Sequence, residues 1–266
     1  MFGDVLNTFP SWIVFCASAV FFLLACELGF RYGRGVRLRR EEDDMGSTGL
    51  VTGSILGLVS FLLAFTFGIA ASNFSERRGL VLDEANAIGT AYLRADLIAE
   101  ATQAEELRAL LHEYVEDRAS IGLVKEMTIA DTMQLIRASE VLQTRMWQLV
   151  APMARDNPTP TNSLIVSALN DVIDFHTLRV AVGVRHTIPD IIWLALYVIS
   201  GLALGATGYR FGVSFDKRSE LLPGMVIAFT ALITLIADLD DPRHGFLKND
   251  QSAMIELLHT MQVPEA

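Results

Sequence analysis

The chain has 266 residues, of which 52% are hydrophobic, and its formal net charge at pH 7 is −10. The positive mean hydropathy of +0.38 comes from long apolar blocks, which indicate a membrane protein rather than a soluble one. The excess of acidic residues argues against nucleic acid as a partner, because phosphate binding needs a basic stripe.

Four apolar segments are long enough to cross a bilayer, which takes about 20 helical residues. They cover residues 10–30, 49–72, 188–209 and 221–237, approximately. No basic residue precedes the first segment, so we do not expect a cleavable signal peptide. Its two cysteines, Cys16 and Cys26, lie roughly 15 Å apart along one helix, which is too far for a disulfide bond between them.

The second segment belongs to a longer uncharged run, residues 45–75. A helix of that length spans roughly 46 Å, so it can cross the membrane and continue beyond it. Aromatic rings at positions i and i+4, such as Phe61 and Phe65, usually pack against neighbouring helices, but hydrophobic constrictions can also gate a pore. Small residues recur along the run every three or four positions and would let helices approach closely; they are Gly53, Gly57, Ser60, Ala64, Gly68 and Ser72.

Amphipathic helical patterns fill the region that follows, residues 73–187. Thr102, with Glu105 three positions later, predicts a helix start near Ala104, and the Asn-Pro-Thr-Pro run at 157–160 predicts a break. We expect four parts: two membrane helices with a basic loop, a helical body outside the membrane, two further membrane helices, and an acidic turn with a C-terminal helix. Their bounds are residues 1–72, 73–187, 188–238 and 239–266.

Basic residues near the membrane favour one orientation. The two short loops, after the first and third spans, carry eight lysines and arginines, against six near the membrane on the other side. The positive-inside rule therefore favours short loops in the cytoplasm and the helical body outside it. The margin is modest, and long domains are translocated largely regardless of their charge.

Polar residues at two places have more than one possible role. Asp238, Asp240 and Asp241 close the fourth span; they could hold a cation through oxygen ligands or simply end a membrane helix at the headgroups. Glu84 and Asn86 lie on an otherwise apolar helix. Buried polar groups need partners, which could be Arg94 or residues of another subunit.

The sequence assembles no enzyme site. His112 and Glu113 lack the second histidine of a metalloprotease helix, and the other histidines form no pair at ligand spacing. No nucleophile with a base, no phosphate loop and no metal-ligand set is present in the sequence. We therefore expect no enzymatic activity, no cofactor and no metal site.

Three short motifs carry a resemblance to a known family. Residues 54–57 (S-I-L-G), 62–65 (L-L-A-F) and 74–80 (F-S-E-R-R-G-L) resemble the second membrane helix of bestrophins and its extension. The D-L-D-D-P run at 238–242 resembles the acid-rich segment that follows the last bestrophin membrane helix. Residues 84–94 are closer still to the bacterial bestrophin-like domain proteins. The resemblance covers most of residues 49–261 and rests on the order and spacing of these motifs.

The resemblance implies an all-α, multi-pass protein of the inner membrane with four transmembrane helices per subunit. It implies a homopentameric, mainly chloride-conducting channel in which five copies of the second helix surround the axis. Phe65 aligns with the last aromatic of the family's hydrophobic neck, and Phe61 lies one turn before it. Gly57 stands where the family carries a bulky apolar residue, which would widen that ring or shift the register. Gly68 and Ser72 are expected to line the pore beyond the neck.

Two departures from the family stand out. Residues 243–248 interrupt the acidic cluster that senses calcium in animal bestrophins, so we expect no calcium site of that kind. Bestrophins also keep their helical body in the cytosol, opposite to the side that the arginine count favours here. The partners expected are the bilayer, small inorganic ions and other copies of the chain. The alternative is a structural or signalling membrane protein whose body binds a partner and which conducts no ions.

Overall fold

The computed structural model describes residues 9–38, 45–123, 129–185, 187–214, 221–241 and 250–262. These residues form eight α-helices and no strand, which confirms the predicted all-α fold. The chain divides into two compact units. Unit 1 comprises Met1–Asn73 with Thr187–Lys248, and unit 2 comprises Phe74–His186 with Asn249–Ala266.

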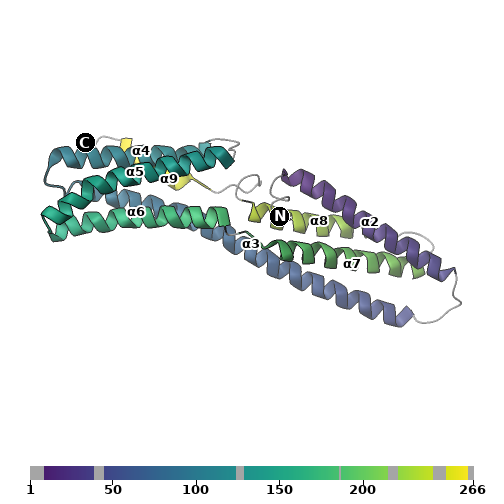
Figure 1. Ribbon diagram of the computed structural model, residues 1–266. Coiled ribbons are helices and arrows are strands. Elements are labelled where there is room, and N and C mark those ends of the chain that lie inside the picture. The colour runs from purple at the N-terminus through teal and green to yellow at the C-terminus, as the bar shows by residue number, and fades with distance from the viewer. Residues whose placement is uncertain are drawn as a thin grey trace. The chain divides into compact units, whose positions relative to one another are not determined.

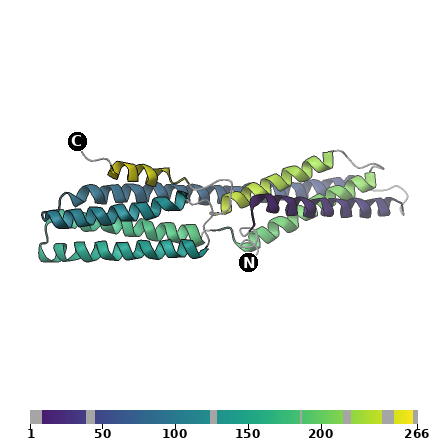
Figure 2. The same cartoon turned by 90° about the horizontal axis from the view of Figure 1, so that it is seen from above.

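Unit 1 holds the helices that can span a membrane. It contains α2 (Ser11–Arg37), α7 (Asp190–Ser214), α8 (Leu221–Asp240) and the first part of α3 (Met45–Ala95). All four helices are long and apolar enough to cross a bilayer by length and composition. Within unit 1, α2 packs against α7 and α8, as both views show (Figures 1 and 2).

Glycines bring α2 and α7 into backbone contact. A Cβ atom added at Gly208 would overlap the carbonyl oxygen of Cys26, and one at Gly29 would overlap that of Gly205. Gly33 and Gly212 are equally closed to a side chain. Lipid tails are as apolar as the helices, so the hydrophobic effect does not press helices together inside a membrane. Close approach of the two backbones stabilises the pair instead through van der Waals contacts.

Adding one methyl group at this contact should destabilise unit 1. We expect Gly208→Ala to cost about 1–3 kcal/mol of unfolding free energy, because the backbones must move apart to admit the methyl group. Gly224→Ala on α8 is the matched control, since a Cβ added there meets no atom within 4 Å. Thermal unfolding in detergent measures both variants. Equal midpoints for the two would contradict the close backbone contact.

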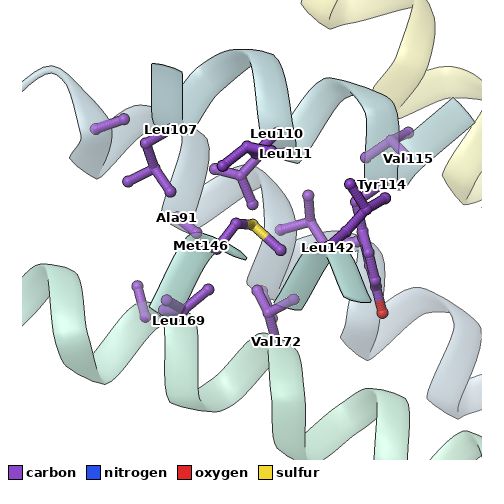
Figure 3. Packing of buried hydrophobic residues seen from close by; sticks show 14 of the residues in the cluster. Ala91, Leu107, Leu110, Leu111, Tyr114, Val115, Leu142, Met146, Leu169 and Val172 are labelled. Carbon is purple, nitrogen blue, oxygen red and sulfur yellow. The ribbon is translucent and has the colours of Figure 1, made fainter. Parts of the chain in front are cut away.

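Unit 2 is a helical bundle with one hydrophobic core. It contains the rest of α3 together with α4 (Ala101–Leu123), α5 (Ile129–Asp156), α6 (Pro160–Arg185) and α9 (Ser252–Gln262). Side chains from α3, α4, α5 and α6 meet in the core, with Met146 of α5 between residues of α4 and α6 (Figure 3). The largest fully buried side chains of this core are Ile88, Leu107, Leu111, Tyr114, Met146, Ile165 and Leu169.

Two predicted helix boundaries can be compared with the structure. The break at 157–160 is confirmed, since α5 ends at Asp156 and α6 begins at Pro160. The hydroxyl oxygen of Thr159 accepts a hydrogen bond from the backbone N–H of Asn162 at 3.2 Å and so caps α6. The start predicted near Ala104 is wrong. Helix α4 begins at Ala101, so Thr102 lies in its first turn, where its hydroxyl donates to the Glu100 carboxylate.

Candidate functional site

One face of α3 is open along the segment that was expected to line a pore. Phe61 is 69% exposed and Phe65 58% exposed, and their rings stack with centroids 6.4 Å apart. Gly57 and Gly68 lie on the same side, and a Cβ added at either would meet no atom within 4 Å. Ser72 is exposed one turn further along. The structure therefore brings the five expected pore residues to a single exposed face.

The opposite face of this segment is packed. Four residues on this face are buried: Val59, Leu63, Thr66 and Ala70. The hydroxyl of Thr66 donates a hydrogen bond to the backbone carbonyl of Leu62 at 2.7 Å, so it needs no partner on another helix. Only 22% of the most apolar window of α3 is buried, compared with 44% for α7. Helix α3 therefore has one packed side and one side that the described residues of the chain leave uncovered.

The exposed face continues beyond the apolar run and becomes polar. Because α3 is one continuous helix, residues separated by whole turns share an angular position. Glu76 and Asp83 follow Phe65 by about three and about five turns, respectively, and both side chains are exposed. Asn86 and Thr90 are exposed on the same side, and the Thr90 hydroxyl donates to the Asn86 carbonyl at 2.9 Å.

Glu84, on the other side of the same stretch, is fully buried at the centre of a polar cluster. Its carboxylate accepts a hydrogen bond from the Tyr114 hydroxyl at 2.6 Å and one from the Arg118 guanidinium at 3.1 Å, both on α4. Arg179 of α6 also donates to it. A buried carboxylate is stable only when it is paired and hydrogen-bonded, and this one meets two guanidinium groups and a phenol.

Three further buried side chains complete what we call the Glu84 cluster. His176 of α6 lies with Nδ1 3.1 Å from the Tyr114 hydroxyl oxygen. The amide nitrogen of Gln143, on α5, donates to the same oxygen at 3.3 Å. Gln251, immediately before α9, accepts from Arg179 at 3.3 Å. The members of the cluster are Glu84, Tyr114, Arg118, Gln143, His176, Arg179 and Gln251.

The cluster supplies partners for Glu84 within the same chain, and Arg94, one of the candidates from the sequence, is not among them. Arg94 does not bond to it and instead donates to the backbone carbonyl of Leu164 at 2.8 Å. Asn86 is not buried with Glu84 but lies on the exposed face of α3. Of the two polar residues that the sequence singled out on this helix, Glu84 is therefore buried and Asn86 is exposed.

Two members of the cluster are held in their neutral forms. Burial and the neighbouring Glu84 carboxylate raise the pKa of Tyr114, so the phenol keeps its proton. Burial and the guanidinium of Arg118, helped by Arg179 and opposed by Glu84, lower the pKa of His176 to about 4. At neutral pH the cluster therefore holds one carboxylate and two guanidinium groups.

The three aspartates at the end of α8 are buried in unit 1. Asp238 accepts a hydrogen bond from the Ser11 hydroxyl at 2.7 Å, and Asp240 accepts one from the backbone N–H of Ile188 at 2.9 Å. These contacts tie α8 to residues at the starts of α2 and α7. Among the residues that the structure describes, no three His, Cys, Asp or Glu side chains form a group that could hold a metal ion.

Sequence reasoning singled out Glu84 but not the side chains that surround it. A signal was present, because Tyr114 and Arg118 are four positions apart on α4 and His176 and Arg179 are three apart on α6. Each pair lies on one face of its helix, and in both cases that face is otherwise apolar. Polar pairs on buried helix faces would have indicated a shared partner.

Comparison with known proteins identifies a family. A model of the bestrophin-like domain matches residues 19–253. A point mutant of a bacterial bestrophin homologue from Klebsiella pneumoniae has a similar fold, with a TM-score of 0.65 and 14% identity over 94% of this chain and 97% of that one. The same homologue solved by zinc phasing gives a TM-score of 0.61 and 14% identity, covering 94% of each chain.

A further structure, described only as a point mutant of a membrane protein, gives a TM-score of 0.64 at 14% identity, covering 94% of this chain and 97% of that one. No curated protein matches the sequence. At this level of identity the solved structures show the shared fold alone. The family model matches most of the chain, and so the protein belongs to the bestrophin-like family.

Proposed function

We propose that the protein is a homopentameric ion channel in which α3 of each subunit lines the pore. The observation that carries the proposal is the exposed face of α3, where no described residue of the chain covers the small residues or the two phenylalanines. Small residues at this spacing let copies of a helix approach one another closely. Membership of the bestrophin-like family supports a channel and a symmetric assembly around this helix.

The narrowest part of the proposed pore is a hydrophobic neck at Phe61 and Phe65. Rings of aromatic side chains on consecutive turns exclude water when the pore is narrow, and an ion cannot cross the resulting dry segment easily. Gly57 adds no side chain one turn earlier, so the neck would have two aromatic rings with a wider entrance beside them. Gly68 and Ser72 would line the pore on the other side of the neck.

Purified protein tests the proposal in two measurements. The mass in detergent, corrected for the bound detergent, should be about 146 kDa, which is five times 29.3 kDa. Proteoliposomes should then release or take up small inorganic ions. A monomer, or a pentamer that passes neither anions nor cations in wild-type and neck variants, would support the structural or signalling alternative.

The sign of the conducted ion has two candidates. The family resemblance implies anions. A specific observation favours cations: the exposed face of α3 carries Glu76 and Asp83, and rings of acidic side chains are typical of cation pores. Two other arginines of α3 have partners elsewhere: Arg78 pairs with Asp250 at 3.3 Å, and Arg94 donates to a backbone carbonyl.

The reversal potential under a salt gradient separates the two candidates. If the acidic face lines the pathway, the wild type should prefer sodium over chloride, and Asp83→Asn combined with Glu76→Gln should shift the reversal potential towards that of chloride. Glu140→Gln, an exposed carboxylate on α5, is the control and should change nothing. A chloride preference in the wild type that is the same in the double variant would favour the anion candidate.

A further inference from the structure

The charges of the Glu84 cluster are not balanced, although the cluster is buried inside unit 2. Arg118 and Arg179 each carry a positive charge, and among the described residues Glu84 is the one carboxylate with which both form an ion pair. Arg118 is 4% exposed and Glu84 is fully buried, so water screens little of this excess. Buried charges are normally balanced by partners, and this cluster keeps a net charge of +1.

Hydrogen-bond donors in the cluster determine where a proton can be added. Tyr114 donates its only hydrogen to the Glu84 carboxylate, which can only accept. The Tyr114 oxygen must then accept from Nδ1–H of His176, 3.1 Å away. Nε2 of His176 is consequently the unprotonated nitrogen. It is buried and has no hydrogen-bond partner among the described residues.

We propose that His176 is a proton-binding site whose protonation in acid releases the unit 2 segment of α3 from α4 and α6. A proton can bind only at Nε2, where it finds no acceptor and raises the charge of the cluster from +1 to +2. The charged and titratable groups that face the imidazole are Glu84 from α3, Tyr114 and Arg118 from α4, and Arg179 from α6 itself, with Gln143 from α5 and Gln251 before α9 as neutral members.

The cluster joins the elements that acid would separate. Glu84 ties α3 to α4 and α6 through three hydrogen bonds, and no other carboxylate takes part in them. A protonated His176 is stable only where it reaches water, which requires α6 or α4 to move away from α3. The open arrangement therefore binds protons more tightly than the closed one, and acid favours it by linkage.

The size of the effect follows from the difference between the pKa of His176 in the closed arrangement and its pKa in the open one. The closed body holds the pKa of His176 at about 4, whereas an exposed histidine has its ordinary value of 6.5. The difference of about 2.5 pH units corresponds to a shift of about 80-fold in the ratio of open to closed forms between pH 6.5 and pH 4, and to about 300-fold over the whole titration. The shift begins below pH 6.5, because only the open form takes up protons there.

Hydrogen exchange of the full-length protein, corrected for the intrinsic pH dependence of amide exchange, tests the proposal. Amides of α3 from residue 80 to 95 should lose up to about 80-fold of their protection between pH 6.5 and pH 4. His176→Asn keeps an amide donor near the place of Nδ1 but takes up no proton, so its protection should change little with pH. His112→Asn on α4, whose histidine lies at the body surface beside Glu116, should behave as the wild type.

Two results would overturn the proposal. The first is wild-type protection that does not fall between pH 6.5 and pH 4, a measurement that needs no variant. The second is a fall in His176→Asn that matches the wild type. His176→Gln, which places its amide near the site of Nε2, replaces His176→Asn if the latter does not fold. None of these outcomes depends on ion conduction, so they separate this inference from the proposed channel.

Discussion

Phe65→Ala should raise ion flux through reconstituted protein about tenfold or more. In the proposed pore, five phenyl rings are removed from the neck, and water can then fill the segment that they kept dry. A barrier lowered by only 1.4 kcal/mol already gives a tenfold faster rate. Flux into proteoliposomes, normalised to the amount of inserted pentamer, measures the change.

Phe67→Ala is the matched control. Phe67 is an aromatic residue of the same helix, two positions beyond Phe65, and is only 37% exposed. Two positions correspond to about 200° of helical rotation, so its ring does not share the exposed face of Phe61 and Phe65. Equal increases in flux from both variants would mean that the helix is merely destabilised, and would contradict a neck at Phe65.

Glu84→Gln should lower the unfolding free energy of unit 2 by about 3–5 kcal/mol. The substitution keeps the shape of the side chain but removes the carboxylate charge, which leaves Arg118 and Arg179 buried without a counter-charge. Breaking a buried ion pair by removing one partner has a cost of this order. Chemical denaturation followed by circular dichroism measures the change in unfolding free energy.

Glu113→Gln provides the comparison for a surface ion pair. Glu113 and Arg145 lie 3.7 Å apart, and each side chain is more than half exposed. Pairs of this kind contribute about 0–1 kcal/mol, because water screens them and both side chains lose freedom. If Glu84→Gln and Glu113→Gln unfold at the same denaturant concentration, the Glu84 cluster does not hold the body together.

The architecture of the membrane helices was largely predictable from hydrophobicity. The uncharged run at 45–75 predicted a helix that continues past the membrane, and α3 does extend as one helix to Ala95. The close contact of α2 and α7 was less visible. Gly29, Gly33, Gly208 and Gly212 lie in different segments of the sequence, and only the packed structure shows that they face one another.

The candidate site was predictable on one side of α3 and not on the other. The spacing of Gly57, Phe61, Phe65 and Gly68 depends only on the helical period, so the sequence alone places them on a common face. The partners of Glu84 depend on tertiary packing. They lie 30 to 95 positions away along the chain, and Arg94, one of the two kinds of partner that the sequence left open, bonds elsewhere.

If the exposed face of α3 lines an aqueous pore, residues on that face are accessible to water-soluble reagents, and cysteine accessibility measures this most directly. In a background with Cys16→Ser and Cys26→Ala, Ser72→Cys should react with a charged, water-soluble thiol reagent, and the reaction should reduce ion flux. Phe67→Cys should show no such block. Complete modification of Ser72→Cys, verified by mass, with unchanged flux would contradict a pore lined by α3.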